Sequence, residues 1–292
     1  MNHRGTQPET RLPRGLLHGR GCFWTGGDTS MIAHVRATAS IAYMTFLEAI
    51  RNRLIMVALL FAVVLIALSV AAGSVSLGHR GRLILDVGLA ATSAISTLIA
   101  IALTVVSVGN EIRRKTAYTL LARPIPRWVY LLGKLIGISV TMQILVSLKL
   151  AATAGTVLLH GDVIPEAFWA SIWLSYLEMG LVVAISLFFT TMAVPVLAAA
   201  YSAGLLIAGN LAGDIWSLAQ KSLERGQLEM GQLLEVIYYI LPDIEELSLR
   251  HQAANNLAVP EGFLLAATFY AFTYGGLALL GAVGIFSRKR LL

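Results

Sequence analysis

Apolar residues occur along most of this chain in long uninterrupted blocks, and short polar segments separate the blocks. The first block, residues 54–77, contains no charged residue. A helix rises about 1.5 Å per residue, so a block of roughly 20 apolar residues matches the ~30 Å hydrocarbon core of a bilayer. The blocks lack the period-2 alternation of a transmembrane barrel, and a helix satisfies its own backbone groups in lipid. The pattern therefore predicts an all-α membrane protein.

Six blocks are long enough to cross a bilayer, and from them we predict a bundle of six transmembrane helices. The predicted spans are residues 54–77, 83–109, 129–159, 168–194, 196–213 and 262–286. Together they form one transmembrane domain over residues 54–292.

Besides the shorter connections between blocks, three longer segments lie outside them. Residues 1–30 are polar and rich in Gly and Arg, so we expect a disordered tail, or an extension upstream of a true start at Met31. Residues 31–53 mix apolar and charged positions, which predicts an amphipathic helix lying in the membrane interface. Residues 214–261 are acidic and include an amphipathic stretch, Leu218–Tyr239, which predicts a helical external loop between spans five and six.

The composition agrees with a membrane protein. The chain is 57% hydrophobic and 13% charged, whereas soluble domains average about 25% charged residues, and its mean hydropathy is +0.75. Its single cysteine, Cys22, excludes an internal disulfide and a cysteine-based metal cage. Short basic loops at a membrane surface explain the net charge of +6, so we expect membrane lipids as partners and no nucleic acid.

The distribution of Lys and Arg indicates the orientation. Counting spans places Arg51 and Arg53, residues 110–127 and the C-terminal Arg288-Lys289-Arg290 on one side, with the acidic 214–261 region on the other. Short basic loops stay in the cytoplasm. Arg80 and Arg82 run against this trend, but the other basic clusters outweigh them. We therefore predict a multi-pass protein of the cell inner membrane with both termini in the cytoplasm.

The segment between spans two and three, residues 110–127, is the most polar short segment within the bundle. It carries one acidic residue, Glu111, against five basic residues. A short amphipathic helix is expected at about 111–122, and Pro124 and Pro126 end it because proline lacks an N–H and restricts the residue before it. Such a helix is a rigid lever joined to two spans. The alternative is a basic loop that only sets the topology.

This region resembles the permeases of the ABC-2 type, the membrane subunits of one class of ATP-binding-cassette exporters. The resemblance rests on Glu111, Lys115-Thr116, Leu120-Leu121, Pro124, Arg127 and Gly133-Lys134, with Lys115 standing where the family often has glycine. It extends over Met31–Leu292. It implies that residues 110–128 are a cytoplasmic coupling segment, seated in a groove of the nucleotide-binding subunit. The implied contact residues are Glu111, Arg113, Arg114, Lys115, Thr116, Leu120, Leu121, Arg123 and Pro124.

The resemblance implies the permease subunit of an exporter that moves an unidentified substrate by alternating access. The chain lacks a Gly-x-x-x-x-Gly-Lys-Ser/Thr phosphate loop, so we expect no cofactor bound directly, with ATP and Mg held by a partner ATPase. Two ATPase copies are expected. Six spans are few for a path, which predicts a homodimer with the conduit between its copies, a related heterodimer being the alternative. We predict no catalytic residue and no metal site.

Two charged residues, Lys149 and Glu178, fall inside predicted spans at similar distances from the outer ends of neighbouring helices. A charge within the bilayer costs at least a few kcal/mol, so we predict an intramembrane ion pair between them. The pair is either on the transport path or purely structural, and outward snorkelling of Lys149 is the remaining alternative.

Two other functions remain open. A secondary transporter or channel is the first, although it is expected to show repeated halves and broken helices around midplane charges. An intramembrane enzyme is the second. It needs clustered acidic or histidine side chains at membrane depth, whereas the six histidines fall in tails, interfacial segments or loops.

Overall fold

The computed structural model of this chain describes residues 29–75, 80–113, 126–159, 161, 163–225, 227–244, 247 and 262–288. Every regular element within these ranges is a helix. By length and composition, four helices can cross a membrane, or five when the bent pair α8–α9 counts as one span. The four are Ile84–Arg113, Arg127–Leu159, Glu166–Met192 and Phe263–Arg288. These long apolar helices are consistent with a multi-pass membrane protein.

The helices follow the predicted blocks closely. The predicted interfacial segment is helix α1 (Thr29–Ile50), and the first predicted span is α2 (Arg53–Val75). The second is continuous through α3 (Arg80–Thr104), the π-helix η1 (Val105–Gly109) and α4 (Asn110–Arg113). The remaining predicted spans are α6 (Arg127–Leu159), α7 (Glu166–Met192), α8 (Pro195–Asn210) and α12 (Phe263–Arg288).

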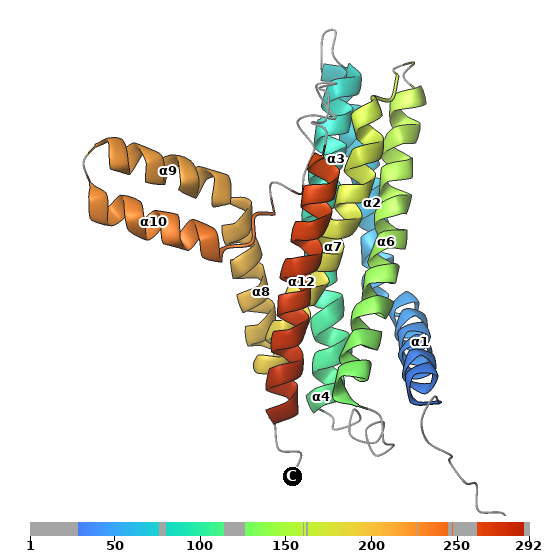
Figure 1. The fold of residues 1–292 in the computed structure, drawn as a ribbon. Helices are drawn as coiled ribbons and strands as arrows, with labels where there is room; N and C mark the ends of the chain where they lie inside the picture. The colour runs from blue at the N-terminus through green and yellow to red at the C-terminus, as the bar shows by residue number, and fades with distance from the viewer. Residues whose placement is uncertain are drawn as a thin grey trace, which may run out of the picture.

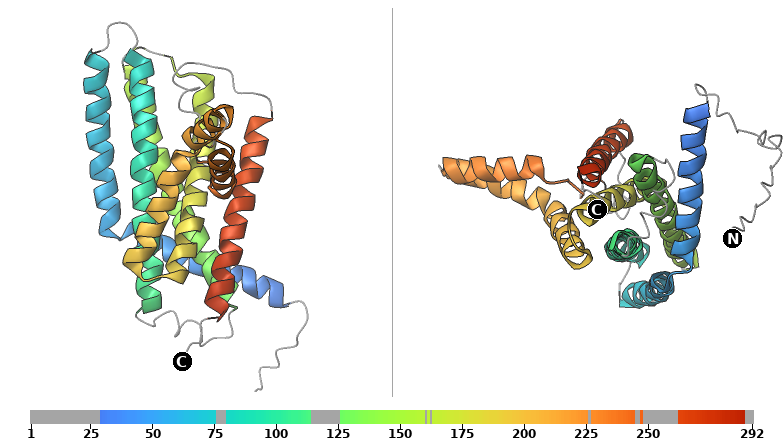
Figure 2. Two further views of the ribbon diagram at one scale, coloured as in Figure 1. Left: turned by 90° about the vertical axis from the view of Figure 1, so that its left-hand side faces the viewer. Right: turned by 90° about the horizontal axis from the view of Figure 1, so that it is seen from below.

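The long helices run side by side along one axis, and α1 lies across one end of the bundle against α6 (Figure 1). The start of α1 and the end of α12 lie at this same end (Figure 2). On the opposite flank, α9 (Ala212–Glu224) and α10 (Leu228–Ile240) form a helical hairpin that projects sideways from the bundle (Figures 1 and 2). The chain bends by 55° between α8 and α9.

Some of the glycines in the predicted spans permit close helix approach, as expected for small residues in membrane bundles. A Cβ placed on Gly281 of α12 would lie 2.9 Å from the Phe188 ring of α7, and one on Gly209 of α8 would lie 2.3 Å from the Pro242 carbonyl oxygen. By contrast, a Cβ on Gly204 or Gly276 would meet nothing within 4 Å. A side chain at position 209 would meet a backbone atom that cannot rotate away, and one at position 281 would force the Phe188 ring to shift, whereas positions 204 and 276 face open space in the single chain.

The hairpin has two chemically different outer sides. The predicted stretch Leu218–Tyr239 is divided between two helices, which separate at Arg225–Gln227. Along α9 the exposed positions are mainly polar, as at Ser217 and Gln220, whereas along α10 they include Leu233 and Val236. The helices pack closely because Gly231 lies against Leu223. The hairpin as a unit is therefore amphipathic.

Candidate functional site

Close contact between α1 and α6 creates a polar site at the end of the bundle where α1 starts and α12 ends. A Cβ on Gly133 would lie 2.8 Å from Ile41 Cβ, and one on Gly137 would lie 2.6 Å from the Ala42 carbonyl oxygen. Only glycine leaves room for α1 at these two positions. The crossing also places Glu48, one turn after the buried Thr45, beside the lysine that follows Gly133.

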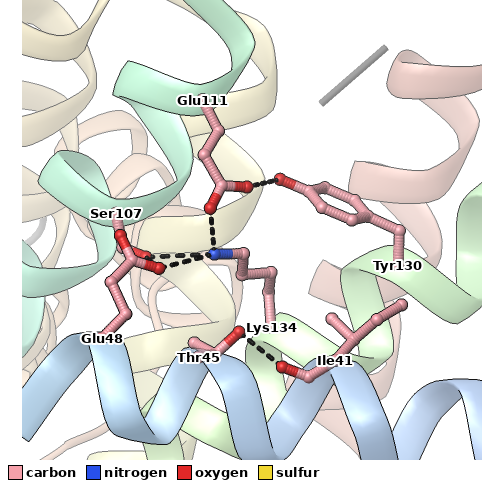
Figure 3. A network of polar contacts seen from close by, with 7 residues as sticks. All are labelled: Ile41, Thr45, Glu48, Ser107, Glu111, Tyr130 and Lys134. Carbon is pink, nitrogen blue, oxygen red and sulfur yellow. Dashed lines mark hydrogen bonds and ion pairs between the residues drawn. The ribbon is translucent and has the colours of Figure 1, made fainter. Parts of the chain in front are cut away.

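That lysine, Lys134, is the centre of the site (Figure 3). Its Nζ forms an ion pair with Glu111 and a second one, at 3.2 Å, with Glu48 Oε2. Nζ also donates to Ser107 Oγ at 3.3 Å, and Tyr130 donates its hydroxyl hydrogen to the second carboxylate oxygen of Glu111. We call Glu48, Ser107, Glu111, Tyr130 and Lys134 the Lys134 network.

The π-helix η1 lies immediately before Glu111 in the sequence. A π-helical turn adds a residue to an otherwise α-helical segment and is often found at functional sites. Here it separates α3 from α4 and contains Ser107, while Glu111 follows in α4, and both side chains reach Lys134. Within η1, Ser107 contacts the network, whereas Val105 and Val108 belong to the buried apolar core.

The ammonium group of Lys134 is attracted more strongly to Glu111 than to Glu48. Lys134 is buried, with 3% of its surface exposed, whereas the side chain of Glu111 is 21% exposed and that of Glu48 is 48% exposed. Water screens an exposed ion pair strongly and a buried pair little. Glu111 is therefore the stronger partner, and Glu48 supplies a weaker attachment to α1.

A second set of contacts joins the network to the last helix. The Tyr130 ring stacks on Phe286 of α12 with 6.1 Å between ring centroids. Arg127 Nη1 donates to the carbonyl oxygens of Phe286 and Ser287 at 2.9 and 2.8 Å. Arginine stabilises a helix C-terminus in this way because the last carbonyls lack partners within the helix. We call Arg127, Tyr130 and Phe286 the α12 clasp.

Only part of the predicted coupling segment is described. Glu111 is in the network, and Arg113 is exposed at the end of α4. The other predicted contact residues lie outside the described residues: Arg114, Lys115, Thr116, Leu120, Leu121, Arg123 and Pro124. Their contact with an ATPase stays a prediction. The described residues stop at Arg113, two positions after Glu111 of the Lys134 network, and resume at Pro126, next to Arg127 of the α12 clasp.

Sequence reasoning did not assign Glu48, Ser107, Tyr130 or Lys134 to a site. Lys134 belonged to the Gly133-Lys134 motif, and its position in an apolar block was a usable signal because an intramembrane cation needs a partner. The sequence offered no comparable signal for Ser107. Its role depends on the π-helical geometry of a segment that reads as uniformly apolar.

Lys149 and Glu178 each bond to a serine of α3. Lys149 Nζ donates to Ser96 Oγ at 2.9 Å, and Ser93 Oγ donates to Glu178 Oε1 at 2.6 Å. Both charged residues are buried. The α3 helix therefore offers neighbouring hydroxyl groups to the charges on α6 and α7, and direct pairing of Lys149 with Glu178 stays a prediction.

A groove of about 420 Å³ opens between α3 and α8 beside this polar layer. Its walls are mostly apolar, but they include Ser93, Thr97 and Asn210. Ser93 therefore links the groove to the buried carboxylate of Glu178. Polar groups on an open side of a membrane bundle favour contact with a solute or another protein over contact with lipid tails.

Among the described residues, no group of three or more His, Cys, Asp and Glu side chains is placed to hold a metal ion. The Lys134 network joins two carboxylates to one ammonium group and connects α1, α4 and α6. Comparison of the chain with protein-family models and with curated proteins gives no match.

Proposed function

We propose that this chain is the permease subunit of an ATP-binding-cassette exporter, driven by ATP hydrolysis in a separate subunit. The observation that supports this most directly is the contact between Glu111 and Lys134. These residues flank the basic segment in sequence, and both belong to the pattern that resembles ABC-2 permeases. In such a transporter a cytoplasmic push has to reach several spans together, and this contact offers a route.

The route has two branches. At one end of the coupling segment, Lys134 joins α4 to α6 and, through Glu48, to α1. At the other end, Arg127 and Tyr130 join α6 to the last turn of α12. A displacement of residues 114–125 therefore acts on helices that are already connected to one another. A loop that only sets topology has no need of these connections.

The proposed topology has six spans, with α2 as the first and the bent α8 as the fifth. α2 has 23 residues, enough for about 34 Å of helix. Short basic loops stay in the cytoplasm. Arg51, Arg53, Arg113, Arg127 and Arg288 belong to segments at the end shared by α1 and the C-terminus of α12, so we place that end and both termini in the cytoplasm. The membrane is then the cell inner membrane, with α1 in its cytoplasmic interface and the α9–α10 hairpin on the opposite side.

A second copy of the chain is the proposed neighbour of the α3–α8 groove. The groove exposes Ser93, Thr97 and Asn210 at a surface that lipid tails cover in a lone chain. Pairing two copies through this side converts two open grooves into one enclosed path that carries these polar groups, which six spans alone do not provide. The complete transporter then contains two permease copies and two ATPase copies, with ATP and Mg bound only by the ATPase.

Co-purification in mild detergent, followed by ATPase assays on the reconstituted complex, tests this function. We expect an ATPase subunit to accompany the chain, and the double change Arg113→Glu and Arg114→Glu to release it while membrane insertion persists. Arg225→Glu, on the exposed end of α9, is the matched control and should leave the complex intact. Transport by the purified chain with no ATP-hydrolysing companion would contradict the proposal.

The buried Lys149 and Glu178 favour one competing function, a secondary transporter that uses charges at membrane depth. The two functions differ in their energy source. Transport that follows an imposed ion gradient in the absence of ATP supports the secondary transporter, and transport that requires ATP supports the permease.

A further inference from the structure

A groove of about 500 Å³ runs along the outside of the bundle where α6, α7 and α12 meet. It extends over Leu132–Gln143 of α6, Tyr176–Ala184 of α7 and Ala271–Leu279 of α12, and its walls are almost entirely apolar. Two glycines help to form the hollow. A Cβ added to Gly180 or Gly276 would meet nothing within 4 Å.

Contacts between the same three helices frame both ends of this groove. At the end away from the termini, Trp173 Nε1 donates to Thr268 Oγ1 at 3.1 Å, and the hydroxyl groups of Tyr176 and Ser147 lie 2.6 Å apart. At the other end the α12 clasp holds α12 against α6. The groove is therefore a hollow of limited length within a fixed frame.

The length of the groove indicates what kind of molecule it can hold. Its walls span eleven helical steps on α6 and eight on α7, which correspond to about 16 and 12 Å. Half of the hydrocarbon core of a bilayer is about 15 Å thick. A transmembrane helix of a second protein needs the full thickness and a diameter of about 10 Å. A single acyl chain needs only the depth of one leaflet.

We propose that this groove is a binding site for one acyl chain of a phospholipid with an anionic head group, taken from the leaflet at the end that carries the termini. Arg127 belongs to the clasp beneath the groove, and Arg113 and Arg288 are exposed at the same end. Basic groups between transmembrane helices attract anionic head groups. Groove walls and lipid tails are equally apolar, so fit and head-group charge, rather than the hydrophobic effect, distinguish this lipid from its neighbours.

Photolabelling of the full-length chain tests the site. The chain is reconstituted into phosphatidylethanolamine vesicles that contain a phosphatidylglycerol with a photoreactive diazirine on its acyl chain. We expect labelled peptides from residues 132–143, 176–184 and 271–279. Gly180→Leu adds a side chain to the groove wall at a position where a Cβ meets open space, and should lower this labelling to the level of the exposed surface of α2. Gly204→Leu on α8 is the matched control, since its added Cβ also meets open space, and should leave the labelling unchanged.

The head group is tested with a phosphatidylcholine that carries the same photoreactive chain. With about one basic group acting on the head group, we expect roughly fivefold weaker labelling of the groove by phosphatidylcholine. Equal labelling by the two lipids would overturn the proposal. So would groove labelling that is insensitive to Gly180→Leu, or cross-links that place a second copy of the chain in the groove. Because no ATP is present, failure here leaves the proposed transport function standing.

Discussion

Lys134 and Glu111 lie 23 positions apart in the sequence and form an ion pair at the base of the bundle. The basic segment between them connects the end of α4 to the start of α6 in the sequence. The ion pair therefore joins the two helices that this segment connects. A force on the segment reaches α4 beside Glu111. It reaches α6 first at Arg127 and Tyr130 and then at Lys134, so the ion pair is one of the first contacts to test.

Replacement of Lys134 by methionine should destabilise the folded chain substantially. The change keeps most of the side-chain volume but leaves the carboxylates of Glu48 and Glu111 near each other with no cation. Breaking a buried ion pair by removing one partner costs about 3 kcal/mol or more. Thermal unfolding in detergent measures the loss. Lys221→Met on the exposed surface of α9 is the control, and equal shifts in the two variants would show that Lys134 is not a structural centre.

The two acidic partners should differ in their contributions. The Glu48 side chain is more than twice as exposed as that of Glu111, so water screens its attraction to Lys134 more strongly. We expect Glu48→Gln to cost less than about 1 kcal/mol of unfolding free energy, and Glu111→Gln to cost more. A double-mutant cycle of each change with Lys134→Met separates the pair energies. A larger coupling for Glu48 would reverse our assignment of the stronger partner.

Any side chain at position 137 should separate α1 from α6. A Cβ there would lie 2.6 Å from a backbone oxygen of Ala42, which cannot rotate away as a side chain does. We expect Gly137→Val to lower the free energy of unfolding by about 1–3 kcal/mol, the usual range for overpacking. Gly204→Val is the control because its site is open. A cross-link between cysteines placed on α1 and α6 should also form more slowly in the Gly137→Val background, and an unchanged rate would contradict the close contact.

The helix boundaries were predictable because uninterrupted apolar blocks have few other ways to satisfy their backbone in lipid. α6 and α7 accordingly begin and end within a few residues of the predicted spans. The grouping around Lys134 was not predictable in the same way. Glu48 is 86 residues from Lys134, and their meeting depends on which face of α6 receives α1. Gly133 and Gly137 marked that face, but small residues recur in several spans.

The polar layer shows a different limit. The sequence predicted similar positions along neighbouring spans for Lys149 and Glu178, and the long apolar blocks placed both inside helices. Their contact with α3 could not be predicted, because the sequence of a single span does not reveal the order of the helices around the bundle. In the structure α3 contacts both α6 and α7, so its serines serve the two charges. Serines are common in membrane helices, and nothing local distinguished these two.

The hydroxyl group of Ser96 should contribute to stability only when residue 149 is a lysine. Ser96→Ala removes the acceptor of a buried ammonium group, and we expect a loss of about 1–3 kcal/mol in unfolding free energy. Lys149→Met removes the charge itself, and the double change Ser96→Ala with Lys149→Met should recover most of the stability. Thermal unfolding of the three variants measures these changes in stability. An additive double change would show that the two residues act independently.

The two sides of the α9–α10 hairpin should differ in their access to water. Exposed positions on α9 are mainly polar, whereas α10 exposes several large apolar side chains, a distribution that suits a hairpin lying in a membrane interface. In a Cys22→Ser background, we expect a membrane-impermeant maleimide added outside intact cells to label Ser217→Cys readily and Leu233→Cys at least several-fold more slowly. The proposed topology places this hairpin outside the cytoplasm, so labelling of Ser217→Cys only after cell lysis would invert the orientation. A face of α10 covered by lipid excludes a charged reagent. Equal labelling rates at positions 217 and 233 would therefore show that water surrounds the hairpin on both sides, and they would leave the proposed orientation unchanged.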